Sequence, residues 1–214
     1  MSIGIVGAGA LGANAARLLA KNGISATIAN SRGPESLAGF VEEVGPSIQA
    51  VTFGEAASAD IVLVALRWVD VEKALDGLPS WNGRIVIDAT NPVEFLDPDS
   101  PDRNDPSNPL AAYGIKAIDL GGKHSSEVFR KFVPGARVVK AFNHVDATTL
   151  PEPTASGGQR VLFYSGDDAD AKAQVRKILD QTGYFAVDLG ILDVGGPLAS
   201  LPFGPLAGAN FVKI

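Results

Sequence analysis

Residues 3 to 12 read Ile-Gly-Ile-Val-Gly-Ala-Gly-Ala-Leu-Gly, a short apolar stretch that leads directly into a Gly-x-Gly-x-x-Gly turn. The apolar stretch predicts a buried strand, and apolar residues at helical spacing after the turn predict a helix that ends at Gly23. Glycine permits the positive φ values and the close backbone approach that such a turn needs. A strand, this turn and a helix in this order predict a dinucleotide site, with a pyrophosphate at the N-terminus of the helix.

The rest of the chain alternates between strand-like and helix-like segments. We expect further strands at residues 24–30, 48–53, 60–66, 84–89, 137–142, 159–165 and 185–189, and further helices at 35–44, 69–78, 125–132 and 169–182. Strands joined by right-handed helical crossovers form a parallel sheet with helices on both faces. The predicted fold class is therefore α/β, a doubly wound Rossmann-type and mainly parallel sheet with a small C-terminal α/β extension.

Two segments break this alternation. Residues 92–113 are rich in proline and aspartate and predict a long irregular loop, either a binding loop or lid or a solvated insertion. Residues 190–214 contain too many glycines and prolines to predict a helix. We expect this tail to wrap the surface or to complete a pocket.

Composition narrows the classes of function. The 214 residues include no cysteine, which excludes disulfides, cysteine nucleophiles, thiolate metal sites and iron–sulfur clusters. A net charge of −6 without a basic stripe argues against a nucleic-acid partner. The apolar runs are too short to cross a bilayer, and residues 1–20 lack the pattern of a signal peptide. We expect a cytoplasmic protein that does not bind membranes.

The end of the second expected strand indicates which dinucleotide binds. Rossmann domains specific for NAD carry a carboxylate there, which accepts hydrogen bonds from the ribose hydroxyls. This chain instead has Asn30, Ser31 and Arg32. A guanidinium pairs with the 2′-phosphate of NADP, whereas a carboxylate would repel it. These residues favour NADP over NAD.

Two other strand ends should face the same crevice, because ligands bind at the carboxyl ends of the strands in such sheets. Leu66 ends the strand at 60–66 and Arg67 follows it, and Asn91 and Pro92 follow the strand at 84–89. We predict that they border the cofactor, although Asn-Pro is also an ordinary turn sequence.

Few side chains could carry proton chemistry. His144 follows a strand end and is the better candidate of the two histidines for a contact with substrate, while His124 precedes an expected helix. Lys140 is a second candidate proton donor. The sequence contains no metal-ligand cluster, no Tyr-x-x-x-Lys pair in the expected position and no Gly-x-Ser-x-Gly elbow. We therefore assign no catalytic side chain beyond the candidate His144.

The chain resembles the NADP oxidoreductases that depend on the deazaflavin coenzyme F-420, together with their dinucleotide-binding relatives. The resemblance extends over nearly the whole chain. It is carried by the glycine turn and by four later motifs, which are Asn30-Ser31-Arg32, Ala89-Thr90-Asn91-Pro92, the run from Val133 to His144 (Val-Pro-Gly-Ala-Arg-Val-Val-Lys-Ala-Phe-Asn-His) and Gly195-Gly196-Pro197-Leu198.

This resemblance implies hydride transfer between NADP(H) and a flat acceptor such as a deazaflavin or flavin, with coenzyme F-420 or a flavin as the co-substrate. It implies that Ser31 and Arg32 bind the 2′-phosphate. The residues implied for the pyrophosphate are Gly7, Ala8, Gly9, Ala10, Leu11 and Gly12. Those implied for the acceptor site, beside Asn91 and Pro92, are Asn143, His144, Gly196, Pro197 and Leu198.

On this basis residues 1–145 would form the NADP-binding Rossmann domain, and residues 146–214 would complete the acceptor site. Two alternatives stay open. One is an NADPH-dependent reductase of a small carbonyl or imine, which would need His144 or Lys140 as a proton donor. The other is an NADP-binding sensor without catalysis. An open sheet edge and an apolar tail would suit a homodimer.

Overall fold

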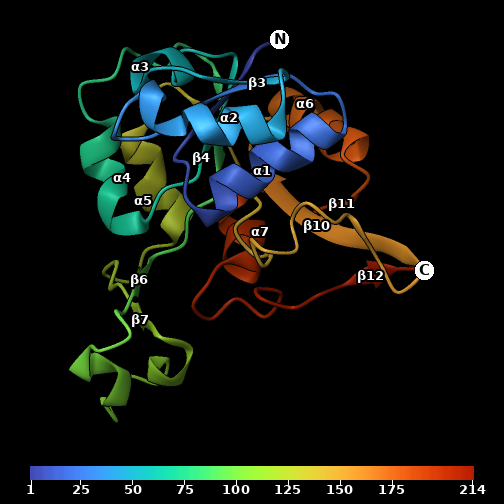
Figure 1. Cartoon of the computed structure of the whole chain (residues 1–214). Helices are drawn as coiled ribbons and strands as arrows, with labels where there is room; N and C mark the ends of the chain where they lie inside the picture. Colours follow the sequence, from blue (N-terminus) through green and yellow to red (C-terminus); the bar gives the residue numbers. More distant parts are fainter.

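The computed structural model describes residues 1–214 and is built on one central sheet (Figure 1). Its main strands run in the order β11-β10-β8-β5-β4-β1-β2-β3. In chain order they are β1 (Ile3–Val6), β2 (Ala26–Ala29), β3 (Ile48–Ala50), β4 (Ile61–Val64), β5 (Ile85–Asp88), β8 (Arg137–Ala141), β10 (Gly158–Gly166) and β11 (Phe185–Asp188). Neighbouring strands from β3 to β8 are parallel, β10 is antiparallel to β8, and β11 is parallel to β10. The short strands β9 (Thr154–Ala155) and β12 (Val212–Lys213) pair with β10.

Helices cover both faces of this sheet. One layer contains α1 (Ala10–Lys21), α2 (Ala38–Val44) and α6 (Ala169–Gln181), and the other contains α3 (Phe53–Ala56), α4 (Trp68–Leu75), α5 (Ser125–Phe132) and α7 (Leu192–Ala199). Alternate residues of a strand enter opposite cores: Ile61 and Leu63 pack on the first layer, and Val62 and Val64 on the second. Both faces of the central strands are thus buried, as their continuous apolar sequences predict. The predicted doubly wound fold is confirmed.

Most predicted elements match within a few residues, with one omission in the first half. The segment predicted as a single helix at 35–44 is a 3₁₀ turn, η1 (Pro34–Leu37), followed by α2. The strand predicted at 48–53 ends at Ala50, because α3 begins at Phe53. Thr52 and Glu55 cap this short helix reciprocally, which is the Thr-x-x-Glu signature of a helix start. This signature is present in the sequence at residues 52–55.

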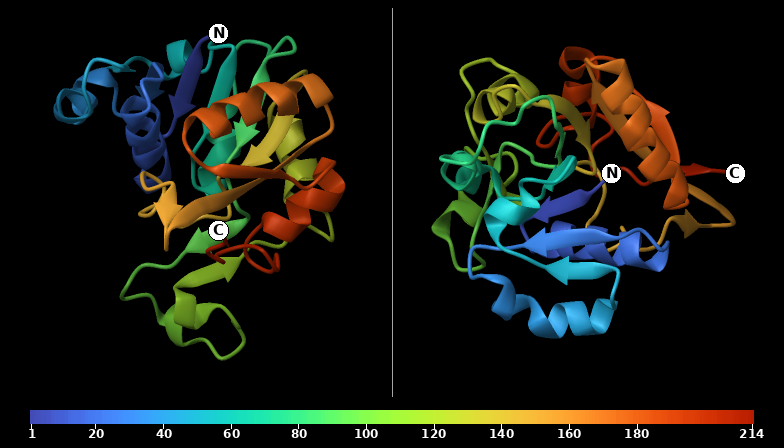
Figure 2. Two further views of the ribbon diagram at one scale, coloured as in Figure 1. Left: turned by 90° about the vertical axis from the view of Figure 1, so that its right-hand side faces the viewer. Right: turned by 90° about the horizontal axis from the view of Figure 1, so that it is seen from above.

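The proline-rich segment contains regular structure, so the prediction of one irregular loop over residues 92–113 is wrong for the strand at its start and for two short 3₁₀ turns. Strand β6 (Val93–Phe95) pairs in antiparallel fashion with β7 (Ile115–Ala117), and two 3₁₀ turns lie between them, η2 (Pro101–Asn104) and η3 (Ala111–Tyr113). The resulting hairpin projects from the main body (Figures 1 and 2). A small core of Val93, Leu110 and Ile115 holds it together, against which Leu201 of the tail packs.

The tail contains a helix, α7, which the sequence reading did not predict. A Cβ at Gly195 would be 2.6 Å from Cβ atoms of Leu189 and Ser165, so only glycine lets this helix lie so close to the sheet. The same glycines have low helix propensity, which is why the sequence predicts no helix in this segment. Tertiary packing therefore overrides propensity here. Strands β10 and β11 also continue the sheet across the proposed boundary between residues 145 and 146.

A buried ion pair joins the carboxyl ends of β5 and β8. The Lys140 ammonium lies 2.8 Å from Asp88 Oδ2, and both side chains are almost fully buried, at 1% and 0% exposure. Lys140 Nζ also donates to the carbonyl of Thr90 at 2.9 Å, and the second oxygen of Asp88 accepts from the N–H and hydroxyl of Thr90. Each charge thus has several partners, which is the condition for burying it. The pair fixes the turn that follows β5.

His144 joins β8 to the C-terminal strands. Its side chain is buried, its Nε2 accepts the N–H of Phe163 at 3.2 Å, and its ring packs on the Phe163 ring. Burial lowers the pKa of His144 to about 4. The imidazole is consequently neutral at pH 7, when Nε2 can act as an acceptor.

This burial predicts a pH dependence of stability. In the unfolded state His144 binds a proton near the ordinary histidine pKa of about 6.5, whereas in the folded state it does so only near pH 4. Protonation therefore favours the unfolded state. The contribution of His144 to the free energy of unfolding is fully present above pH 6.5 and is lost as the pH falls towards 4. The full loss from this group is about 3 kcal/mol.

Urea unfolding of the wild type and of His144→Gln between pH 7 and 4.5 measures this loss. Glutamine can accept a hydrogen bond from the Phe163 N–H but does not titrate. We therefore expect the free energy of unfolding to fall less steeply with decreasing pH in the variant than in the wild type. Carboxylates contribute equally to both curves. Parallel curves would contradict the assignment, and NMR titration of His144 in the wild type provides a check that needs no variant.

Candidate functional site

The turn between β1 and α1 exposes an unobstructed helix N-terminus. Gly9 is the N-cap of α1, no side chain caps the helix, and its first turn contains no acidic residue. The first N–H groups of a helix have no partner within it, and they carry its positive dipole end. This end is therefore available to an anion.

Three glycines shape this turn in different ways. Gly7 has φ +104°, and a Cβ there would overlap the carbonyl of Ala65 at the end of β4. A Cβ at Gly12 would overlap the carbonyl of Gly7, so this glycine lets α1 pack against the turn. Gly9 differs, because a Cβ there would meet no atom within 4 Å. The space above Gly9 is therefore open.

A groove of about 630 Å³ opens from this turn along the carboxyl ends of β1, β2 and β4. Strands β1 and β4 are neighbours from which the sheet extends in opposite directions, and this is the position where doubly wound sheets bind ligands. Eight of the predicted cofactor residues line the groove: Gly7, Ala8, Gly9, Asn30, Ser31, Arg32, Leu66 and Arg67. The sequence reading missed its other lining residues, which are Phe53, Ala65, Asp70, Lys73 and Ala74.

Asn30 shapes the end of β2 through its own hydrogen bonds. Its Oδ1 accepts the N–H of Arg32 at 2.9 Å, and its Nδ2 donates to the hydroxyl of Ser36. This local turn holds the backbone of residues 31 and 32 against the groove. The side chains of Ser31 and Arg32 remain exposed, and the Arg32 guanidinium has no ion-pair partner. Arg32 is thus free to bind an anion.

The predicted acceptor residues form a second group, away from the groove lining. Asn91 and Asn143 interlock: Asn91 Nδ2 donates to the Asn143 carbonyl at 2.6 Å, and Asn143 Nδ2 donates to Asn91 Oδ1 at 3.1 Å. Asn143 also donates to the carbonyl of Ala199, and Asn91 Oδ1 accepts the N–H of Leu201. The two asparagines therefore connect the ends of β5 and β8 to the tail that follows α7.

The remaining predicted residues differ in accessibility. Ala10, Leu11 and Gly12 form the first turn of α1, and Pro92 is buried after Asn91. Gly196 is buried within α7, Pro197 is half-buried, and Leu198 is exposed. Lys140 and His144 are both buried, which closes them off from the groove. No cluster of His, Asp or Glu is arranged to hold a metal ion, and none of the helices combines the length and apolar character that crossing a bilayer requires.

Comparison with known proteins identifies relatives of this chain. Residues 2–92 match the family model described as NADP oxidoreductase coenzyme F420-dependent. A solved structure of the hypothetical protein SMa0349 from Sinorhizobium meliloti is 37% identical, with all of this chain and 97% of that chain covered and a TM-score of 0.85. A protein from Arthrobacter sp. FB24, provisionally described as an F420-dependent NADP reductase, is 26% identical, with 90% and 86% coverage and a TM-score of 0.67.

Rat (Rattus norvegicus) metalloreductase STEAP3 is 26% identical over 202 residues. The alignment covers 94% of this chain but only 36% of STEAP3, so the chain spans about a third of that relative. The family match covers the glycine turn, the end of β2 and Asn91, which were among the residues that suggested the resemblance. Over residues 2–92, this chain is therefore similar to the family of coenzyme F420-dependent NADP oxidoreductases.

Proposed function

We propose that this chain binds NADP(H) in the groove at β1, β2 and β4 and transfers hydride between the nicotinamide and a flat ring acceptor, such as a deazaflavin or flavin. The observation that carries the proposal is the coexistence, in one groove, of an open glycine turn and the unpaired Arg32. The former suits a pyrophosphate, and the latter suits a 2′-phosphate.

The chain's contribution would be binding and orientation. The N–H groups at the start of α1 would hold the pyrophosphate, and Ser31 and Arg32 would hold the 2′-phosphate. Bound NADPH supplies the hydride, and most of the rate enhancement would come from fixing donor and acceptor rings at contact distance. The interlocked Asn91 and Asn143 keep the ends of β5 and β8 rigid beside the proposed acceptor site.

The burial of the two candidate proton donors supports a ring acceptor over a carbonyl or imine. Lys140 is held by Asp88 and Thr90, and His144 is neutral and bonded to the backbone at Phe163. Neither side chain reaches solvent, so neither is positioned to protonate a substrate in the groove. A deazaflavin or flavin can take its proton from water and needs no such acid.

Gly9→Ala separates cofactor binding from folding. Because its Cβ meets only open space and Gly9 has φ −74°, the variant should fold, with a melting temperature lowered only slightly by the poorer N-cap preference of alanine. It should nevertheless weaken the binding of both NADPH and NADH by about tenfold or more, since the methyl group would occupy the proposed pyrophosphate position. Isothermal titration calorimetry measures both affinities.

Gly39→Ala is the matched control, because a Cβ there also meets no atom within 4 Å but lies on α2, outside the groove. Gly12→Ala should instead lower the melting temperature, because it overlaps the Gly7 carbonyl. Wild-type affinity of Gly9→Ala for both dinucleotides would argue against the proposed pyrophosphate position.

Arg32→Ala tests the preference for NADP. Loss of a charge-assisted contact should weaken the binding of NADPH by about 1.5 to 3 kcal/mol, which is roughly 10- to 150-fold in affinity. The binding of NADH should change much less. Arg176→Ala is the control, since Arg176 lies on α6 outside the groove. Equal losses for NADPH and NADH would contradict a role at the 2′-phosphate.

The acceptor is tested by following NADPH oxidation at 340 nm with coenzyme F-420, FMN, riboflavin, a cyclic ketone and a cyclic imine. We expect turnover with at least one ring acceptor and none with the ketone or imine. Reduction of only the ketone or imine would overturn the proposed acceptor class. Tight NADPH binding without any turnover would favour the sensor alternative.

A further inference from the structure

Three cationic side chains line the groove, and they differ in their partners. Arg67 lies at the N-cap of α4 and pairs with Asp70, with Nε 2.8 Å from Oδ2. Arg32 and Lys73 line the same groove and form no ion pair. Because Asp70 is already paired, the groove keeps two uncompensated positive charges.

The spacing of α4 explains why Lys73 reaches this groove. Residues three or four apart lie on one side of a helix, and Asp70, Lys73 and Ala74 all line the groove. Ala74, which follows Lys73, contributes only a methyl group to the groove lining. Arg32 approaches from the end of β2, so the two free cations come from different elements.

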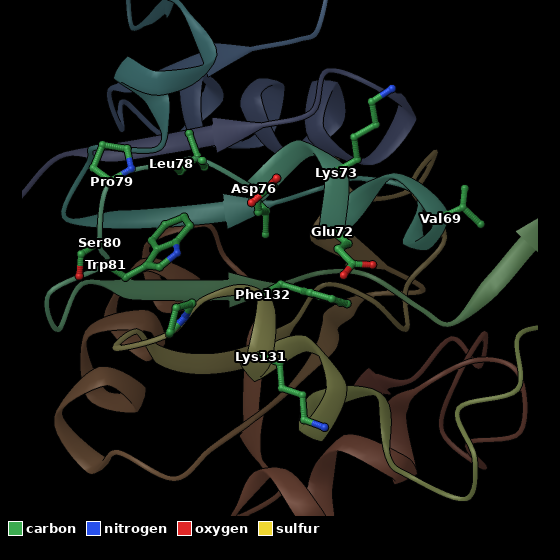
Figure 3. A pocket seen from close by; sticks show the side chains of 13 residues that line it. Val69, Glu72, Lys73, Asp76, Leu78, Pro79, Ser80, Trp81, Lys131 and Phe132 are labelled. Atoms are coloured by element: carbon green, nitrogen blue, oxygen red, sulfur yellow. The ribbon is translucent and has the colours of Figure 1, made fainter.

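Lys73 also borders a second hollow of about 670 Å³ between α4, α5 and the loop around Trp81, shown in Figure 3. Glu72 and Asp76 line that second hollow. Figure 3 shows the Lys73 side chain extending away from both carboxylates, and neither forms an ion pair with it. Its ammonium therefore stays available although acidic residues are close in sequence.

We infer that Lys73 is a second specificity-determining residue, which binds the 2′-phosphate of NADP(H) from the side opposite Arg32. A phosphate monoester carries up to two negative charges and three acceptor oxygens, so it can accept hydrogen bonds from two cations at once. A ribose hydroxyl, as in NAD(H), offers no such charge. This inference rests on the proposed binding of NADP(H) in the groove.

The experiment measures affinities of NADPH, NADH, 2′,5′-ADP and 5′-AMP for the wild type and for Lys73→Ala, Lys73→Gln and Lys73→Arg. Removal of the charge should weaken NADPH and 2′,5′-ADP by about three- to tenfold, since the lysine is solvent-exposed. NADH and 5′-AMP should change less than about twofold, and Lys73→Arg should retain most of the affinity for NADPH. Raising the salt concentration should reduce the difference between wild type and Lys73→Ala.

Lys131→Ala is the matched control. Lys131 is an exposed lysine without an ion pair that lines the second hollow but not the groove (Figure 3). It should leave all four affinities unchanged. Equal weakening of NADPH and NADH by Lys73→Ala would overturn the inference, because it would indicate a pyrophosphate contact, and so would an unchanged affinity for 2′,5′-ADP.

The two proposals fail in different ways. If the wild type binds NADH as tightly as NADPH, the proposed cofactor preference is wrong irrespective of Lys73. If the wild type prefers NADPH and Arg32→Ala removes that preference while Lys73→Ala does not, the proposed function stands and the role of Lys73 is rejected. Retention of the melting temperature in each variant shows that the affinities refer to folded protein.

Discussion

The close approach of backbone to backbone at the β1–α1 turn is the constraint on which the site depends. Gly7 lies against the Ala65 carbonyl at the end of β4, and Gly12 lies against the Gly7 carbonyl. A side chain at either position would push α1 or β4 away from the turn. Because these contacts fix the start of α1 beside the ends of β1 and β4, they also place its free N–H groups at the groove. The position of the groove is thus a direct consequence of how tightly this turn packs.

Charges in the molecule follow two different rules. Between β5 and β8, Asp88 and Lys140 are removed from water and each has several partners, so their charges are satisfied within the fold. In the groove, Arg32 and Lys73 are exposed and lack ion-pair partners. Burying a charge without partners would cost desolvation free energy, whereas an exposed charge stays hydrated and can bind a ligand later. The contrast explains why Lys140, a candidate acid by sequence, is better understood as a structural residue.

The sequence predicted the parts of the fold that depend on local patterns. Buried strands were visible as apolar runs, and α1 and α6 as helical periodicity. The capping signature at Thr52 could also have revealed α3. The helix α7 could not be predicted in this way, because its glycines and proline oppose helix formation locally and the packing of Gly195 on β10 compensates for it. The pairing of β6 with β7 likewise depends on a contact between residues far apart in the chain.

For the site, the sequence by itself determined the glycine turn, the replacement of a carboxylate by Arg32 and the likeness to a family of NADP oxidoreductases. These features are local, since each depends on residue type at a fixed spacing from the turn. Only the tertiary structure decided which charges are free. It paired Arg67 with Asp70, buried His144 against Phe163, and brought Lys73 of α4 to the groove that Arg32 of the β2 end also lines. Availability of a side chain depends on its neighbours in space, and a sequence specifies those neighbours only through the fold.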